Sequence, residues 1–312
     1  MELEKLSRNY GTWSPLQVVR VHTIGLLAVR NRTRSAAIVN KMKLHGGGWG
    51  LVLMLATGPV LAHDPVFGIG PHVLFKGGVE IAPEVRTRKK GGDRDTELGL
   101  ELTYGITGDW AAGVELPYAR VSAGGESSSG VGDASLFTKY RFWRKDSLGL
   151  QRSATILLKV KTDTAANKDA PALGTGTTDA IMGLAYGYES RKWYHWAGAR
   201  YRKNGTNAAG LRRGDKILLD LVTGIRLKPT GYLEPDTVWL LELNGEFGQR
   251  AERNGFELAN TGGTQIFLSP GIFWTQRNFA IKAGVQIPIY QDLNGDQEEP
   301  DYRVKLIFEW HL

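Results

Sequence analysis

The sequence contains no cysteine, so disulfide bonds, thiolate catalysis and cysteine-ligated metal sites are excluded. It also lacks an apolar run of about 20 residues, the length that a membrane-spanning helix needs. Excess charge is missing from most of the chain. Subtracting the eight bases and two acids of residues 1–62 from the totals of 39 and 32 leaves 31 bases and 30 acids in residues 63–312. The net charge of +7 of the whole sequence therefore comes mainly from residues 1–62 and gives no support to a nucleic-acid partner.

The longest apolar run outside strand-like patterns covers residues 49–62 and contains Pro59. Lys41 and Lys43 precede it, and it ends in the small-residue pattern Val60-Leu61-Ala62. This arrangement predicts a secretory signal peptide over residues 42–62. Residues 1–41 are then predicted to be an upstream extension from a mis-called start codon, and residues 63–312 the mature protein. N-terminal sequencing of the purified protein tests this division.

The last eleven residues, 302–312, alternate with a period of two. One face is apolar and the other is charged apart from Ile307, as expected of a strand between an apolar and an aqueous phase. Such an end is similar to the C-terminal insertion signal of outer-membrane barrels, which would be read by the barrel-insertion machinery. The alternative is an edge strand of a soluble sandwich.

Eleven further segments show the same alternation, and no part of residues 63–312 has helical periodicity. In nine of the twelve segments one phase carries no Asp, Glu, Lys or Arg, and in the other three the apolar phase carries one such residue within two positions of an end, although these residues make up 23% of the chain. A lipid phase would enforce this exclusion, because a base near its midplane costs about 2–4 kcal/mol. The sequence therefore predicts an all-β fold, a transmembrane antiparallel up-and-down β-barrel of about 12 strands. The segments cover about 73–86, 96–106, 110–121, 133–144, 153–163, 178–189, 193–202, 215–227, 237–249, 264–275, 278–290 and 302–312.

Long and short connections alternate along the chain, which is the pattern of outer-membrane barrels. Residues 145–151 form a connection of intermediate length, and residues 228–236, with two prolines, are the exception. The long ones cover residues 87–95, 122–132, 164–177, 203–214, 250–263 and 291–301. This predicts that both termini are periplasmic and that the protein lies in the outer membrane of a Gram-negative bacterium. An aromatic belt near the short turns agrees with contact to outer-membrane lipid; its members are Trp110, Trp143, Trp193, Trp239, Trp274 and Phe279.

The charged phase of each strand is predicted to line the lumen. Lys139 and Arg141 on one strand and Lys159 and Lys161 on the next would repel one another without acidic partners. Two arrangements are open: a basic wall opposite an acidic one around a narrow path, or acids and bases that interlock as a salt-bridged plug. The lumen candidates are Lys76, Glu80, Glu84, Glu97, Glu101, Glu115, Lys139, Arg141, Lys159, Lys161, Arg200, Lys216, Asp220, Arg226, Glu242, Glu246, Lys282, Gln286, Arg303, Lys305 and Glu309.

Three stretches carry a family resemblance: GDASLFTKYRF at 132–142, SPGIFW at 269–274 and AGVQIPIYQ at 283–291. From about His63 to its end, the chain resembles the outer-membrane transporters named for the meta pathway of phenol degradation. The resemblance implies a barrel that admits small, often aromatic or hydrophobic, molecules. It implies no particular substrate.

Pro117 and Pro288 occupy equivalent places in two copies of one pattern, AGVELP and AGVQIP. Each proline removes a ladder hydrogen bond from a strand that should be paired on both sides. One interpretation is a bulge that shapes the barrel wall. The other is a kink that opens a lateral gap, through which an apolar solute could leave the lumen.

Chemistry beyond transport has little support. Residues 63–312 contain four histidines, and the chain has neither a Gly-x-Ser-x-Gly elbow nor a His-Glu-x-x-His motif, so we expect no enzyme and no cofactor. No metal site is predicted; His63, as a new N-terminus, and His72 are weak copper-ligand candidates. The main hypothesis is a passive channel for small organic solutes. The alternative is a non-conducting structural or copper-linked metal-handling barrel.

Overall fold

A computed structural model describes residues 64–165, 171–231 and 234–312; the predicted signal peptide and upstream extension lie outside them. Within these ranges, no helix has the length and apolar character needed to cross a membrane. Four strands are short: β4 (Glu126–Val131), β9 (Leu211–Arg212), β12 (Glu252–Arg253) and β13 (Phe256–Glu257). The twelve long strands are β1 (Val79–Lys90), β2 (Asp93–Gly105), β3 (Trp110–Ala123), β5 (Ser135–Ser147), β6 (Leu150–Lys161), β7 (Asp179–Ser190), β8 (Trp193–Lys203), β10 (Lys216–Ile225), β11 (Asp236–Gly248), β14 (Gly263–Gln276), β15 (Phe279–Leu293) and β16 (Pro300–His311).

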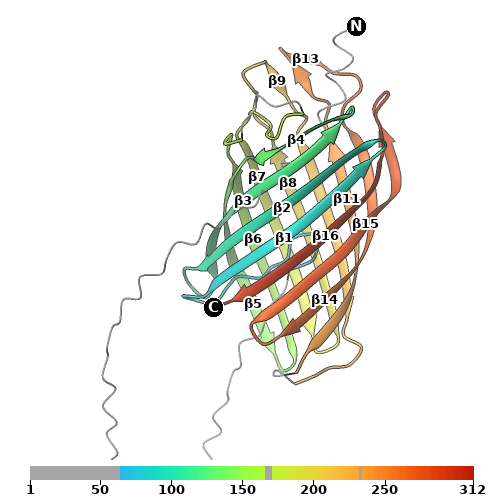
Figure 1. The fold of residues 1–312 in the computed structure, drawn as a ribbon. Coiled ribbons are helices and arrows are strands. Elements are labelled where there is room, and N and C mark those ends of the chain that lie inside the picture. The colour runs from blue at the N-terminus through green and yellow to red at the C-terminus, as the bar shows by residue number, and fades with distance from the viewer. Residues whose placement is uncertain (1–63, 166–170, 232–233) are drawn as a thin grey trace, which may run out of the picture. The chain divides into compact units, whose positions relative to one another are not determined.

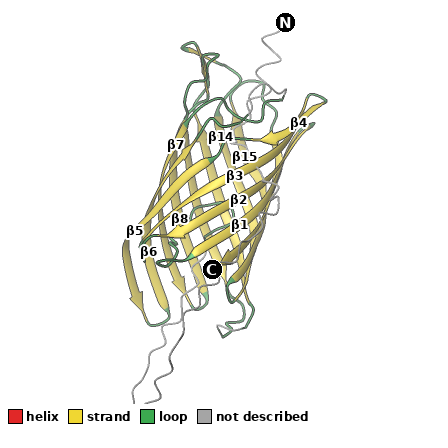
Figure 2. Cartoon of the chain, turned by 60° about the vertical axis from the view of Figure 1, so that its left-hand side comes forward, coloured by secondary structure: helices red, strands yellow, loops and turns green. Residues whose placement is uncertain are grey.

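The long strands form one closed antiparallel barrel (Figures 1 and 2). Each long strand pairs with the next one along the chain, and β1 pairs with β16 to complete the ring, for example at Glu80 and His311. The predicted barrel of 12 strands is confirmed. A closed ring satisfies backbone groups on both sides of every strand, which is why a sheet can stand in lipid only in this form.

The two faces of each strand have opposite chemistry. On β10, Leu221 is 59% exposed, whereas Asp220, its neighbour, is 2% exposed. The same alternation places Ile217 and Leu219 outside and Lys216 inside. Apolar side chains over the whole outer wall would be unstable in water and are stable in lipid.

Connections differ between the two ends of the barrel. We call the end where β16 stops the terminal end, and the opposite end the loop end. The terminal end has tight turns such as residues 148–149, 191–192 and 277–278 and one longer connection over residues 226–235, and the belt residues Trp193 and Phe279 lie next to two of the tight turns. The loop end carries the longer connections, two of which join through the small sheet β13-β12-β9.

Both ends of the first strand differ from the sequence prediction. The first strand begins at Val79 instead of residue 73, because the chain ahead of it lies inside the barrel. It also continues to Lys90, so the first connection is a tight turn at Gly91 and Gly92, where a long loop was predicted. Cross-strand ion pairs such as Arg88 with Asp95 stabilise this charged extension of the hairpin.

The predicted loop over 122–132 is partly wrong as well, since it contains β4. This strand pairs with the upper part of β3, over Tyr118 to Ala123, while β5 pairs with the lower part, over Trp110 to Glu115. Pro117 lies where one partner gives way to the other. Its missing N–H therefore falls at a natural gap in the ladder.

Pro288 occupies a second gap. The ladder between β15 and β16 ends with the pair of Gln286 and Arg303, and no pair is formed from Ile287 onward. On its other side β15 shifts register against β14, so that Phe267 faces Pro288 and Ile266 faces Tyr290. This shift is a bulge of the kind that a strand proline favours.

Candidate functional site

The lumen is the candidate functional site, and its main feature is the chain that precedes β1. We call residues 64–72 the lumen segment. Its contacts reach the inward faces of strands on several sides of the barrel: Lys139 on β5, Thr155 on β6, Glu189 on β7 and Glu242 on β11. The alternation of the strands predicts periplasmic termini and does not predict that residues 64–72 enter the lumen.

Glu242 holds the centre of the lumen segment. Its carboxylate is fully buried and accepts hydrogen bonds from the backbone N–H groups of Val66 at 2.7 Å, Phe67 at 3.1 Å and Gly68 at 2.9 Å. Consecutive N–H groups that converge on one anion form a concave anion site. Hydrogen bonds to an ionised acceptor are also stronger than neutral ones.

Glycines on the inward faces make room for the segment. A Cβ added to Gly198 would lie 2.8 Å from Ile69, and one added to Gly187 would lie 2.6 Å from Pro71. The same holds for Gly183 toward Ile69, Gly271 toward Val66 and Gly284 toward Phe67. Glycine inside a strand weakens it and marks a close approach by another part of the chain. That signal was present in the sequence.

The segment also covers an apolar cluster within the lumen, formed by inward side chains of β8, β10, β11, β14 and β15. Val66 belongs to this cluster and Phe67 packs against it. Inward apolar positions are unusual in a water-filled barrel. Here they form an apolar surface against which Val66 and Phe67 of the segment are buried. The wall members are Tyr194, Trp196, Val222, Val238, Leu240, Phe273 and Ala280.

Charges fix both ends of the lumen segment. Asp64 pairs with Lys139, and His72 Nε2 lies 2.6 Å from Glu189. Burial by itself would raise the pKa of Asp64, but the Lys139 ammonium, assisted by His72 and Lys282, lowers that pKa to about 2. Asp64 is therefore ionised at any physiological pH, and its ion pair persists.

The predicted basic ladder is neutralised locally. Lys139 meets Asp64, Arg141 meets Asp109, Lys159 meets Glu115, and Lys161 meets both Asp133 and Asp179. These contacts correspond to the interlocked arrangement, not to two opposed walls. Asp64 and Asp133 could not be assigned from strand order, because one lies on the lumen segment and the other in the connection between β4 and β5.

A second network crosses the loop side of the lumen. Glu246 accepts contacts from Lys216 and Arg303, and the Arg303 guanidinium lies 4.2 Å from the ring centroid of Phe267. Gln286 and Asn244 join this network to Asp220, which pairs with Arg200. Buried charges are tolerated when each is paired, and this network meets that condition.

Most predicted lumen residues occupy the inward phase of their strands, but two of them do not behave as wall-lining groups, and one copper-ligand candidate cannot be placed. Lys76 is exposed in the turn before β1. Arg226 lies just after β10 at the terminal end and pairs with Asp236. His63 lies outside the described residues. The inward set comprises Glu80, Glu84, Glu97, Glu101, Glu115, Lys139, Arg141, Lys159, Lys161, Arg200, Lys216, Asp220, Glu242, Glu246, Lys282, Gln286, Arg303, Lys305 and Glu309.

A family model described as "Putative MetA-pathway of phenol degradation" matches residues 63–289, which is most of the chain and begins at the lumen segment. The chain belongs to this family. No curated protein sequence matches it.

Solved structures similar to this family member are outer-membrane barrels. An outer membrane channel from Pseudomonas putida F1 has 15% sequence identity and a TM-score of 0.59, over 78% of this chain and 98% of the other. This likeness shows the fold. The β domain of the Bordetella autotransporter BrkA has 15% identity and a TM-score of 0.43, over 75% and 99%. The NanC porin has 13% sequence identity and a TM-score of 0.43, and the match covers 72% of this chain and 98% of the porin.

Proposed function

We propose that the protein is a passive channel in the outer membrane of a Gram-negative bacterium, carrying small organic solutes down their gradient without a cofactor. The observation that carries this proposal is the lumen segment. It occupies the barrel through hydrogen bonds, ion pairs and apolar contacts, all of which are reversible. A barrel that served only as a scaffold would not need an interior shaped by glycines around one enclosed segment of chain.

The apolar cluster beneath the segment supports an aromatic or hydrophobic solute. When the segment leaves, Tyr194, Trp196 and Phe273 become available to a flat apolar molecule, while charged groups surround them. Pockets for small organic ligands combine these two kinds of side chain. The family's name points to phenol degradation, which agrees with such a solute.

The proposal includes the orientation. Short turns gather at the terminal end, and barrels of this class have short periplasmic turns. Both termini would then be periplasmic, and the alternating strand β16 would present the insertion signal to the barrel-insertion machinery. Protease added to intact cells should cut the loop end and spare the terminal end.

A lateral exit is the finer part of the proposal. The ladder between β15 and β16 stops at Gln286 and Arg303, so the wall beyond Pro288 has unpaired backbone. An apolar solute could pass there from the lumen into the bilayer. Pro288→Val, which restores an N–H donor, should slow uptake of an apolar solute and leave ion conductance unchanged. Equal uptake by both proteins would remove the lateral route.

Conductance in planar bilayers tests the channel itself. The intact protein should show small or intermittent currents, and a variant lacking residues 64–72 should show larger and steadier ones. Liposomes that contain the shortened variant should also swell faster in small uncharged aromatic solutes than liposomes that contain the intact protein. If the shortened variant forms a heat-modifiable barrel but passes neither ions nor solutes, the channel proposal fails.

One observation favours the alternative of a non-conducting barrel, namely that the lumen segment contacts β5, β6, β7 and β11 and that ion pairs join other inward side chains. The copper-linked form of this alternative depends on His63 and His72, and His72 is already engaged with Glu189. A silent shortened variant would favour the structural barrel. Copper binding that is lost in His72→Asn would favour the metal-handling one.

A further inference from the structure

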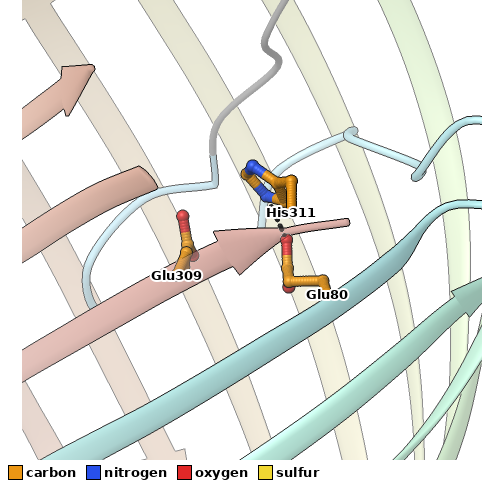
Figure 3. A group of neighbouring side chains, drawn as sticks. All are labelled: Glu80, Glu309 and His311. Carbon is orange, nitrogen blue, oxygen red and sulfur yellow. Dashed lines mark hydrogen bonds and ion pairs between the residues drawn. The ribbon is translucent and has the colours of Figure 1, made fainter. Parts of the chain in front are cut away.

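Three potential metal ligands meet at the terminal mouth of the barrel, outside the lumen segment and the two charge networks. They are Glu80 at the start of β1, and Glu309 and His311 at the end of β16 (Figure 3). One ligand atom from each residue lies within 4.8 Å of the other two. We propose that these residues bind a divalent cation of the zinc class at the seam between the first and last strands.

The backbone creates this arrangement. Glu309 and His311 are two residues apart on one strand, so both point inward, and Glu80 is the direct cross-strand partner of His311. Residues in these positions have Cβ atoms about 5 to 8 Å apart, which lets three side chains converge on one point. The site is therefore built on paired strands, which hold ligands more firmly than a loop does.

The geometry requires only a small adjustment to bind zinc. Ligand atoms at about 2.0–2.2 Å from a tetrahedral ion are about 3.3–3.6 Å apart. His311 Nε2 and Glu80 Oε2 are 2.6 Å apart, and the largest separation in the group is under 4.8 Å. Rotations within the two glutamate side chains can supply the difference while the strands stay in place. Two carboxylates and one imidazole leave a fourth position for water.

The imidazole of His311 has one ring nitrogen that makes no hydrogen bond in the structure. His311 is nine-tenths buried, and its Nδ1 is buried without a hydrogen-bond partner in the structure, while Nε2 meets Glu80. A cation bound by either nitrogen would leave the other available for a hydrogen bond, the usual condition of a metal-ligating histidine.

Lys282 is the natural competitor for the cation. Its ammonium pairs with Glu309 from β15, the neighbouring strand. Asp64 lies close enough to Lys282 to interact electrostatically with it, so a displaced ammonium has a second acidic neighbour. Binding of a cation would exchange one positive charge beside Glu309 for another, and the mouth would not be left with unpaired acids.

The test uses protein purified from membranes in detergent, with ZnCl2 as the probe and EDTA as the reference. Zinc should raise the temperature at which the folded band converts to the unfolded band on a gel, since a ligand that binds only the folded state stabilises it. Co²⁺ should bind once per barrel with an absorption spectrum typical of oxygen and nitrogen ligands. No zinc effect and no cobalt spectrum in the intact protein would overturn the proposal.

The variants sharpen the result. Glu309→Gln and His311→Asn should weaken zinc binding by about tenfold or more, while Lys282→Gln, which keeps all three ligands and removes the competitor, should strengthen it. His195→Asn on the outer face is the matched control and should bind as the intact protein does. Unchanged binding in the two ligand variants, or binding no tighter in Lys282→Gln, would overturn the site. Neither result depends on whether the barrel conducts.

Discussion

Glu242 accepts a 2.7 Å hydrogen bond from the backbone N–H of Val66, although the two residues are 176 positions apart in the chain. This contact joins the middle of β11 to the segment ahead of β1. It also gives the lumen a single acidic group whose removal should release that segment.

Glu242→Gln should raise the open fraction of the channel. Glutamine has one acceptor oxygen, and its NH2 group takes the place of the other carboxylate oxygen. The side chain at position 242 therefore loses its charge and part of its hydrogen bonding to the N–H groups of the segment. A hydrogen bond to a charged group contributes about 1.5–3 kcal/mol, equivalent to roughly ten- to a hundredfold in population. Single-channel recording measures the change. Glu257→Gln, at an exposed position of the loop end, is the control.

Gly198→Ala should also displace the segment, because its new Cβ would lie 2.8 Å from Ile69. The expected result is a larger mean current than in the parent protein. Trimming the partner in the double variant Gly198→Ala with Ile69→Ala should restore the parent current, since the clash is removed. Gly108→Ala introduces a Cβ with no atom within 4 Å and should have no effect. If the double variant behaves like Gly198→Ala, the clash is not the cause.

Lys161→Met should destabilise the barrel strongly. The lysine is 1% exposed and contacts Asp133 and Asp179, both fully or almost fully buried. Removing one partner of a buried ion pair costs about 3–5 kcal/mol, because the remaining charge is left unpaired. Urea unfolding in detergent measures the loss. Lys89→Met, which breaks the exposed pair with Asp301, should cost less than about 1 kcal/mol.

The Asp64 pair predicts a pH dependence. The pKa of Asp64 is lowered from 3.8 to about 2, so the pair contributes stability above pH 3.8 and loses it as the pH falls toward 2. The difference in heat-modification temperature between the intact protein and Asp64→Asn should therefore be constant from pH 5 to pH 8. It should shrink below about pH 4. A difference that already declines between pH 8 and pH 5 would contradict this assignment.

The wall of the barrel could be predicted from the sequence because lipid imposes a rule on every strand. Alternation located all twelve long strands, and the charge-free phase identified their outer faces. Ile307, the apolar residue on the charged face of the last strand, is buried inside the barrel at 6% exposure. The side of the barrel that a residue faces follows from its position in the local alternation, so the outer and inner faces could be predicted without knowledge of distant contacts.

The interior could not be predicted in the same way. Val73 and Phe75 alternate as a strand does, yet they belong to the chain that leads from the lumen segment to β1. Periodicity does not distinguish a strand of the wall from a segment that the wall encloses. The partners of the inward charges could not be predicted from the sequence either. Lys139 pairs with Asp64, which is 75 positions away, and this pair forms only because the enclosed segment places Asp64 beside β5.

The seam between β1 and β16 has a consequence for assembly. The other pairings join strands that follow one another along the chain, whereas Glu80 and His311 are separated by 231 residues. Bringing such distant strands together carries the largest loop-closure entropy in the barrel and should be a slow step of folding. The contact of Val66 with Glu242 would shorten this search by holding the segment ahead of β1 against β11, provided that it forms before the ring closes. The segment that obstructs the finished pore would then act earlier as an internal template for its closure.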